Sequence, residues 1–241
     1  MDSKTAETER IQHRSVRDVL VYNESYQKEI DEYGIYEHFG ETRIGKRMLD
    51  LILGTLGVIV FFLLFPFVAL AIKISSPGPI IFKQKRTGYK GMPFTCYKFR
   101  TMHTRDNIKR IDGKPLVTKQ GDIRIFKFGQ HMRRLNIDEL PQLINVIKGD
   151  ISLVGPRPYA VDECRYWNET FEDHHLRYLV KPGLSGLAQV KGYRGGTHDV
   201  EHMRRRLDWD LYYTKNISFK LDVYVVWHTL LQMFKYETNA H

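Results

Sequence analysis

The sequence predicts a predominantly helical protein with one small β-hairpin, an α+β class, attached to one face of a membrane as a monotopic protein with a re-entrant broken helix. Three observations predict this class. A run of 22 uncharged residues, 51–72, contains Pro66 in its interior. Two β-prone runs flank a glycine-containing loop at 87–91. Several later segments repeat apolar residues at helical spacing.

The composition supports one domain with an appendage. The chain has 241 residues, 42% hydrophobic and 27% charged, which excludes a disordered polymer and a polytopic transporter. Two cysteines exclude a disulfide scaffold and a cysteine-rich zinc module. We therefore divide the chain into an acidic N-terminal extension (1–42), a re-entrant membrane hairpin (43–74) and a cytoplasmic domain (75–241) that ends in an interfacial helix.

Charge is distributed unevenly among these parts. Residues 1–42 hold 5 Lys and Arg against 10 Asp and Glu, whereas residues 73–157 hold 18 against 6. A block this basic favours polyanions such as nucleic acid, anionic lipid or phosphorylated substrates, with a solvated basic surface as the plain alternative. The extension has no sustained apolar period, so we expect it to be partly helical or disordered.

The uncharged run is long enough to cross a membrane, but the charges around it argue against a simple span. As a straight helix it would extend about 33 Å, against about 30 Å of hydrocarbon. Lysine and arginine residues stand at both ends, and the positive-inside rule places both ends on the cytoplasmic side. Pro66 removes one backbone hydrogen bond and can bend a helix. We expect a helix–break–helix hairpin near Pro66 that enters one leaflet and returns, with a plain span as the alternative.

The cytoplasmic domain is expected to begin with turn chemistry at 75–79 and the hairpin strands at 80–86 and 94–100. Residues 217–235 mix apolar and polar side chains, which is typical of a helix that packs on the core or lies at a membrane interface. Further helices are expected at 125–135, 139–148, 162–179 and 200–214.

Two adjacent carboxylates, Asp138 and Glu139, stand at the predicted start of a helix. A helix N-terminus stabilises anions, so both should be ionised near neutral pH. Neighbouring helical side chains point about 100° apart, so one can bind a hard cation while the other faces a substrate. An aspartate can be a covalent nucleophile, and Mg²⁺ is commonly held by one or two carboxylates plus substrate phosphates. The plain alternative is that both residues only cap the helix.

Four sequence blocks resemble the bacterial sugar transferase family, the polyprenyl-phosphate glycosyl-1-phosphate transferases, and in particular the catalytic domain of the larger undecaprenyl-phosphate glucose and galactose phosphotransferases. The likeness runs from about residue 43 to about residue 235 and leaves the extension outside. The blocks, in order, are residues 46–50, 76–102, 138–142 with 152–158, and 181–192.

The resemblance implies an enzyme at the cytoplasmic face of the bacterial inner membrane. Such enzymes move a sugar-1-phosphate from a UDP-sugar to polyprenyl phosphate and release UMP, which starts exopolysaccharide or glycoconjugate assembly. The matching positions imply Asp138 as the nucleophile of a phosphosugar-enzyme and Glu139 as the residue that holds Mg²⁺. They imply nucleotide binding by the loop residues Pro156, Arg157 and Pro158. The family also enters only one leaflet, with membrane lipid as a partner.

The transfer would bring a diphosphate and a phosphomonoester together, and their repulsion must be offset by metal and fixed cations. The candidate cations are Lys98, Arg100, Arg133, Arg134 and Arg157. The plain alternative for each of these residues is a surface cation. The resemblance also implies a further acidic site position at Asp210.

The chain departs from the family pattern at two places. Many members break their membrane helix with Ser-Pro at the positions held here by Phe62 and Leu63, whereas this chain has Pro66 about one turn later. We expect a displaced break. Asn136 stands where Ser or Thr is common.

Two rival functions stay open. A membrane-bound glycosyltransferase would move the sugar alone and leave UDP; the Asp-Trp-Asp run at 208–210 matches a DxD pattern, but it lies in a predicted helix rather than after a strand. A membrane-tethered basic adaptor would leave Asp138 and Glu139 unexplained, so we expect no nucleic-acid partner. The histidines at 174–175 and at 198 and 202 lack an acidic zinc motif. The sequence leaves open the sugar (glucose, galactose or an N-acetylated sugar), the oligomeric state, a homodimer included, and the role of residues 1–42.

Overall fold

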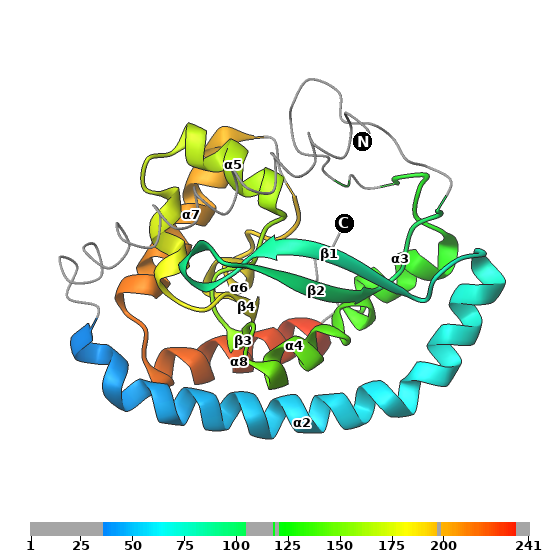
Figure 1. Cartoon of the computed structure of the whole chain (residues 1–241), viewed down its shortest axis with the longest axis horizontal. Coiled ribbons are helices and arrows are strands. Elements are labelled where there is room, and N and C mark those ends of the chain that lie inside the picture. The colour runs from blue at the N-terminus through cyan, green and yellow to red at the C-terminus, as the bar shows by residue number, and fades with distance from the viewer. Residues whose placement is uncertain (1–35, 105–117, 119–120, 197–198, 235–241) are drawn as a thin grey trace, which may run out of the picture.

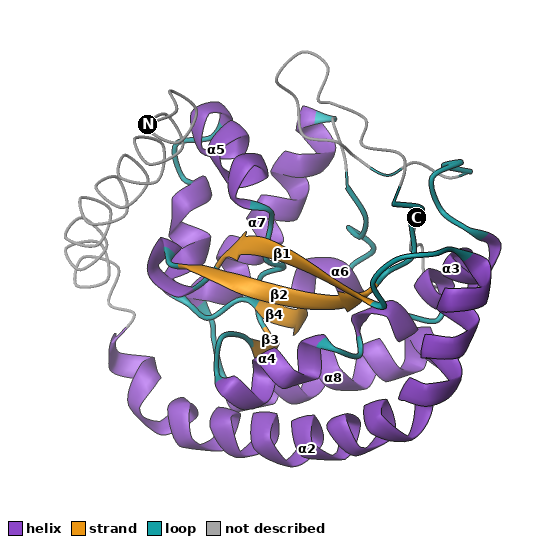
Figure 2. Ribbon diagram, turned by 45° about the vertical axis from the view of Figure 1, so that its right-hand side comes forward, coloured by secondary structure: helices purple, strands orange, loops and turns teal. Residues whose placement is uncertain are grey.

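The computed structural model describes residues 36–104, 118, 121–196 and 199–234, with side chains described from residue 44 to residue 233 within these ranges. It confirms a mostly helical chain with small sheets and one long apolar helix (Figure 1). The expectations for residues 1–35 fall outside the described residues. In Figures 1 and 2 the long helix α2 runs beneath the rest of the molecule, and the β-hairpin lies at the centre.

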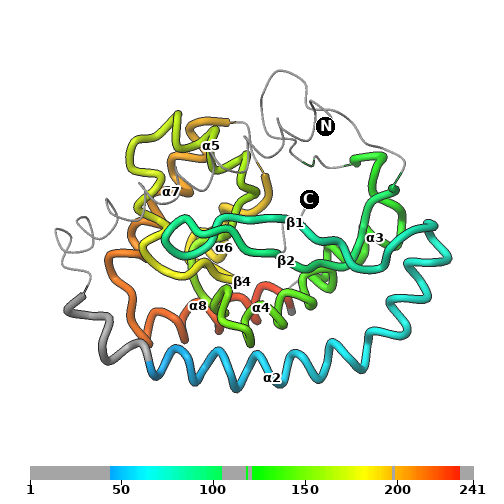
Figure 3. The backbone as a smooth tube through the Cα atoms, viewed as in Figure 1, coloured from blue at the N-terminus to red at the C-terminus, as the bar shows by residue number. Residues whose placement is uncertain are grey.

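Helix α2, Tyr36–Ser75, differs from the predicted broken helix. It continues through Pro66 as one helix, so the interruption expected near Pro66 is not present. A proline removes one hydrogen bond and crowds the preceding turn, and a long helix can absorb this as a bend while its other hydrogen bonds continue. Figure 3 shows α2 as a curved rather than a straight element. Within the described residues, Ile44–Ser75 is the one helical segment that is long and apolar enough to cross a membrane, judged by length and composition alone.

One face of α2 packs along the domain. Gly57 lies against Leu143 and Gly54 against Ile147, both on α4 (Gln142–Lys148), so the two helices approach closely where α2 has no side chain. The opposite face exposes large apolar side chains at steps of three and four residues. These are Met48, Ile52, Leu56, Ile59, Leu63, Phe67, Leu70 and Ile74.

The charged start of α2 is bound into the domain. The Lys46 ammonium donates to the Val154 carbonyl (2.8 Å), the Tyr213 hydroxyl (2.9 Å) and the Asp222 carboxylate (2.9 Å). The Tyr213 hydroxyl also donates to Asp222 at 2.6 Å. Lys46 therefore ties α2 to three other elements rather than serving only as a charge at a membrane boundary.

The next two charged residues of α2 also serve the fold. Arg47 donates to the carbonyls of Val146 and Ile147 at 2.8 and 2.7 Å, which satisfies carbonyl groups at the C-terminal end of α4. The buried Asp50 carboxylate accepts from the backbone N–H of Leu153 at 2.8 Å. We call Lys46, Arg47, Asp50, Tyr213 and Asp222 the α2 clasp.

The hairpin is close to its prediction. Strands β1 (Ile81–Thr87) and β2 (Pro93–Phe99) pair antiparallel with Ile81 opposite Phe99, and a 3-10 turn, η1 (Tyr89–Gly91), joins them. Asn145 on α4 holds β2 in place, because its amide donates to the Thr95 carbonyl (2.8 Å) and accepts from the Tyr97 N–H (3.2 Å). The hairpin is thus fixed on α4, which in turn packs on α2.

Sequence periodicity missed a second, parallel pair of strands, β3 (Ser152–Val154) and β4 (Gly183–Ser185). Both are three residues long, too short to show an alternating pattern. The backbone after β3 passes against β4 so closely that a Cβ on Gly155 would lie 2.3 Å from the Lys181 carbonyl oxygen. The glycine is therefore required by this close approach.

The remaining helices follow the predicted order with shifted bounds. The predicted helix 162–179 is interrupted at 171–173, where α5 ends and a 3-10 segment follows, and the predicted helix 139–148 begins only at residue 142. The elements are α3 (Lys127–Arg134), η2 (Ile137–Glu139), α5 (Val161–Thr170), η3 (His174–Leu179), α6 (Leu187–Val190), α7 (Val200–Lys215) and α8 (Phe219–Phe234).

Candidate active site

The two adjacent carboxylates lie in the short 3-10 turn η2, between α3 and α4. Asn136, just before this turn, has a left-handed backbone with φ of 56°. Asparagine tolerates this conformation better than most residues. The 3-10 turn follows directly, and Pro141 precedes the first residue of α4. Asp138 and Glu139 are therefore held in a tight turn rather than in the first turn of a regular α-helix.

Glu139 is held by two cations that come from different elements. Lys98 at the end of β2 donates to its Oε1 at 2.6 Å, and Arg157 donates to the same oxygen at 2.7 Å. Burial alone would raise the pKa of Glu139, but Arg157 and Lys98 outweigh it and hold the pKa well below its usual range. Glu139 is therefore ionised across the physiological range.

Asp138 is in the opposite situation. Its side chain is buried, and its carboxylate accepts no hydrogen bond from any residue in the described ranges. Burial raises the pKa of Asp138 to about 6; Lys98 opposes this rise, and the negative charge of Glu139 adds to it. A carboxylate that is ionised near neutral pH and poorly stabilised by its surroundings is a suitable nucleophile.

The loop 155–158 brings Arg157 to the turn. Hydrogen bonds to two proline carbonyls fix it on either side of Arg157: Gly183 N–H donates to Pro156 (3.0 Å) and the Arg86 guanidinium to Pro158 (2.5 Å). The prolines restrict the backbone further. Pro156 and Pro158 thus flank Arg157, and their observed contribution is to hold the Arg157 backbone; their predicted contact with the nucleotide stays a prediction.

Arg133 and Arg134, at the end of α3, differ in placement. The Arg133 Nε donates to the Thr101 hydroxyl at 2.9 Å, and its charge acts on both Asp138 and Glu139. Arg134 is exposed. The structure therefore brings Arg133 to the carboxylates.

Arg100 occupies a different place from the one predicted. It is 5% exposed, and its guanidinium donates to the carbonyls of Ser76 (2.6 Å), Pro79 (2.5 Å) and Met102 (3.4 Å) and to the Ser76 hydroxyl (2.9 Å). All three guanidinium nitrogens are used by the turn between α2 and β1. Arg100 stabilises that turn, and its expected contact with phosphate is not supported.

Asp210 is also placed differently from the prediction. It is 1% exposed and paired with Arg177 at 2.5 Å, so it is closed off from any substrate. Asp208, two residues earlier on α7, is exposed and pairs with Arg204. The two aspartates of the DxD-like run therefore point to different environments and do not form one metal site.

Sequence reasoning missed Arg194. It lies in the loop after α6 between two glycines with positive φ, Gly192 (95°) and Gly195 (78°). Its buried Nε has no hydrogen-bond partner in the described part of the chain, and its charge interacts with those of Arg157 and Glu139. The signal was available, because an arginine between two glycines suits a tight loop that presents a cation.

The carboxylate turn can contribute ligands to a magnesium ion. Glu139 is ionised and next to Asp138, and carboxylate oxygens are ligands that Mg²⁺ prefers. No cluster of three or more acidic, histidine or cysteine side chains that could hold a metal occurs in the described residues. Such an ion would therefore draw further ligands from phosphates and water, which fits Mg²⁺.

Comparisons with known proteins place the chain in a family. The bacterial sugar transferase family matches residues 41–236. The chain is 45% identical over 186 residues to a UDP-glucose:undecaprenyl-phosphate glucose-1-phosphate transferase of Caulobacter vibrioides, covering 77% of this chain and 68% of that protein. It is 41% identical to the protein of the same name in Escherichia coli, covering 81% of this chain and 41% of that protein. It is 37% identical to a UDP-N-acetylgalactosamine-undecaprenyl-phosphate N-acetylgalactosaminephosphotransferase of Aeromonas hydrophila, covering 77% and 42%. The match therefore spans less than half the length of the last two relatives.

Proposed function

Because the chain belongs to the bacterial sugar transferase family, we propose that it transfers a sugar-1-phosphate from a UDP-sugar to undecaprenyl or another polyprenyl phosphate and releases UMP. The observation that supports the proposal is the difference between the two carboxylates of the turn. Glu139 is neutralised by Lys98 and Arg157, whereas Asp138 is buried and has no hydrogen-bond partner among the described residues. This arrangement suits one carboxylate for binding and the other for attack.

The proposed reaction has two steps. The Asp138 carboxylate attacks the β-phosphorus of the donor, the bond from that phosphorus to the bridging oxygen breaks, and UMP leaves with that oxygen. A phosphate oxygen of polyprenyl phosphate then attacks the same phosphorus, the bond to Asp138 breaks, and a polyprenyl diphosphate sugar is released. The covalent intermediate lets one site serve a soluble donor first and a lipid acceptor second.

The fixed cations offset the charge that gathers during both steps. Arg157 and Lys98 neutralise Glu139 before the donor binds, and Arg133 and Arg194 add positive charge around the phosphates. Mg²⁺, which Glu139 and the donor phosphates would hold, supplies charge neutralisation and polarises the phosphoryl oxygen. Arginine suits these contacts because its fork matches phosphate oxygens.

We also propose that the protein is membrane-associated from the cytoplasmic side, with the unbroken but curved α2 dipping into one leaflet and both of its ends on the same side. Two observations support this. The apolar stripe of α2 is exposed from Met48 to Ile74 while the other face packs on the domain, so a helix perpendicular to the membrane would draw the domain into the hydrocarbon. Helix α8, which meets α2 where Asp222 binds Lys46, has a second exposed stripe. This stripe consists of Phe219, Val223, Trp227, Leu230 and Met233.

The nucleotide product tests the function. Membranes that contain the protein, given a UDP-sugar, Mg²⁺ and polyprenyl phosphate, should release UMP, whereas a glycosyltransferase would release UDP. UDP-glucose is the first donor to test, followed by UDP-N-acetylgalactosamine, since relatives carry both names. Protein quenched during turnover should carry a hexose phosphate on the peptide that contains Asp138. Turnover with UDP as the product would contradict the proposal.

Cysteine labelling tests the topology. Cys96 and Cys164 are buried, so new cysteines at Ser3 and at the 90% exposed Ile123 should be the reactive ones. With a re-entrant helix, both react with an impermeant reagent from the same side of sealed vesicles. Reaction from opposite sides would establish a span.

A further inference from the structure

Two buried arginines lie behind the candidate site, on elements that contribute no side chain to it. Arg177 belongs to η3 and Arg206 to α7, and each is 1% exposed. Burying a guanidinium is costly unless its charge and donors are used. The buried Asp210 carboxylate pairs with Arg177, whereas Nε and Nη2 of Arg206 have no hydrogen-bond partner among the described residues. The interior therefore holds a surplus cation that packing alone does not require.

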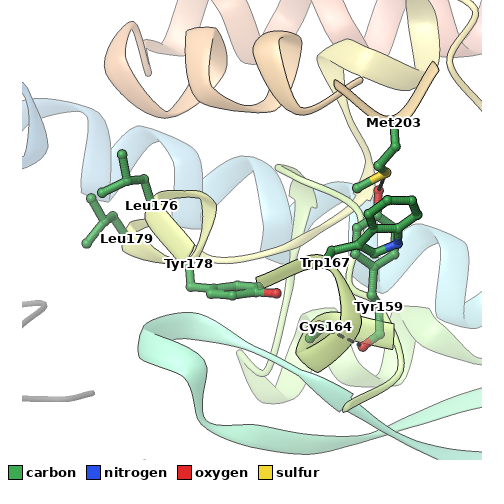
Figure 4. Close-up of a cluster of buried hydrophobic side chains, with 7 residues drawn as sticks. All are labelled: Tyr159, Cys164, Trp167, Leu176, Tyr178, Leu179 and Met203. Carbon is green, nitrogen blue, oxygen red and sulfur yellow. Dashed lines mark hydrogen bonds between the residues drawn. The ribbon is translucent and has the colours of Figure 1, made fainter. Parts of the chain in front are cut away.

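The aromatic ring of Tyr159 compensates part of this surplus. The Arg177 guanidinium carbon lies 4.2 Å from the centre of the ring, and that of Arg206 lies 4.9 Å from it. An aromatic ring attracts cations within about 6 Å of its centre. Figure 4 shows Tyr159 next to Trp167 and to Met203 of α7, inside the hydrophobic cluster, so the ring is itself fixed by packing.

Each buried arginine holds the backbone of a loop that carries an arginine of the site. Arg177 donates to the carbonyl of Arg157 at 2.8 Å. Arg206 donates to the carbonyl of Gly195 at 2.7 Å, next to Arg194. Arg157 and Arg194 are 37 residues apart in sequence. Each of their loops is nevertheless held by an arginine that packs against the same Tyr159 ring. A hydrogen bond to a charged donor is directional and stronger than a neutral one, so it fixes the backbone more firmly than apolar packing would.

We propose that Arg177 and Arg206 are positioning residues that set the spacing of Arg157 and Arg194 for the phosphates of the donor. This inference rests on the proposed function, because the donor is the ligand whose binding would respond. Asp210 takes part in the same arrangement through its ion pair with Arg177. This buried aspartate therefore has a positioning role although it touches no substrate.

A double-mutant cycle tests the part of the proposal that concerns Arg206. Arg206→Met removes the donor to Gly195 and keeps an unbranched apolar stem in its place. We expect the KM for the UDP-sugar to rise about tenfold and kcat to change less than about threefold, because the variant loosens a loop that binds the ground state. In an Arg194→Met background the same substitution should raise KM less than about twofold, because there is no longer an arginine for it to position.

The matched control is Arg165→Met on α5. Arg165 is exposed, and it takes no part in the hydrogen bonds that hold the loops of Arg157 and Arg194, so donor KM should stay at the wild-type value. If Arg206→Met does not fold, as judged by thermal unfolding, the cycle is run with Arg206→Lys, which keeps the charge and alters the donor geometry.

Three outcomes are distinguishable. A tenfold effect that disappears in the Arg194→Met background supports positioning. An equal rise in KM in both backgrounds overturns it, because the buried charge would then act on the donor directly or through general stability. Wild-type protein that releases no UMP from any donor would instead refute the proposed function.

Discussion

The α2 clasp and the carboxylate turn use the same residue types in opposite ways. In the clasp, Lys46 has three acceptors and Asp222 binds both a lysine and a tyrosine hydroxyl. In the turn, Lys98 and Arg157 converge on one oxygen of Glu139, and the neighbouring Asp138 is left with no hydrogen bond from the described residues. Both regions are largely buried, so exposure does not distinguish them.

The difference lies in how completely the buried charge is satisfied. A fully satisfied buried network rigidifies the fold, whereas an unpaired buried carboxylate costs stability and persists where it serves another purpose. The clasp fixes α2 to β3, α7 and α8, and β3 leads directly into the loop that carries Arg157. We infer that the clasp provides the rigid frame and that the turn provides the reactivity.

The largest effect that would test this contrast is the loss of Asp138. Asp138→Asn keeps the shape of the side chain and removes its charge, so UMP release should fall by about 10³-fold or more, while stability stays the same or rises because a buried charge is removed. Initial rates of UMP release and thermal unfolding measure the two quantities.

Asp208→Asn is the matched control for that substitution. Asp208 is 54% exposed in its side chain, so its amide variant should keep the wild-type rate. Wild-type turnover by Asp138→Asn would remove the proposed nucleophile. Loss of activity in Asp208→Asn would instead favour the DxD alternative.

The clasp should show the reverse pattern. Lys46→Met leaves Asp222, which is 1% exposed, without its cation. Breaking a buried pair in this way costs about 3–5 kcal/mol of unfolding free energy. For a domain of this size the melting temperature should fall by roughly 10 °C. The folded fraction should still turn over, because Lys46 does not contact the carboxylate turn.

Lys73→Met is the control for the clasp, because Lys73 is exposed near the other end of the same helix. It should leave the melting temperature unchanged. A Lys46→Met protein that melts like the wild type but has lost turnover would assign the clasp to catalysis and erase the contrast.

Sequence patterns were sufficient to predict the elements with strong local signals. The hairpin, the long apolar helix and the placement of Asp138, Glu139, Lys98 and Arg157 in one region followed from periodicity, composition and family likeness. The continuity of α2 through Pro66 did not, because a proline's effect depends on how the helix packs on either side.

The roles of individual charges were harder to predict than the elements. Arg100 and Asp210 look like site residues in sequence, but tertiary contacts commit them to a turn and to Arg177. Lys46 and Arg47 look like membrane-boundary charges, but they bind carbonyls and a carboxylate inside the domain. Which acceptor a long cationic side chain meets is decided by residues distant in sequence, and no local pattern reports it.

The smallest expected effect is a shift in the pH dependence of kcat/KM. Only the ionised Asp138 can attack, so kcat/KM of the wild type should fall as the pH drops through about 6. Lys98 is the charge that most lowers the pKa of Asp138. In Lys98→Met that influence is lost while Glu139, still paired with Arg157, keeps its negative charge. The pKa of Asp138 should therefore rise further, and the acid limb should move to higher pH by about one unit.

The pH profile of UMP release between pH 5 and about pH 9 measures this shift. Lys85→Met, an exposed lysine on β1 of the same hairpin, is the control and should keep the wild-type limb. A limb that stays in place in Lys98→Met would mean that the group titrating in the wild type is not Asp138. A limb that moves to lower pH would mean that the charges of Lys98 and Glu139 shift the pKa of Asp138 in directions opposite to those given above. The carboxylate turn would then resemble the clasp, in which the buried charges are satisfied.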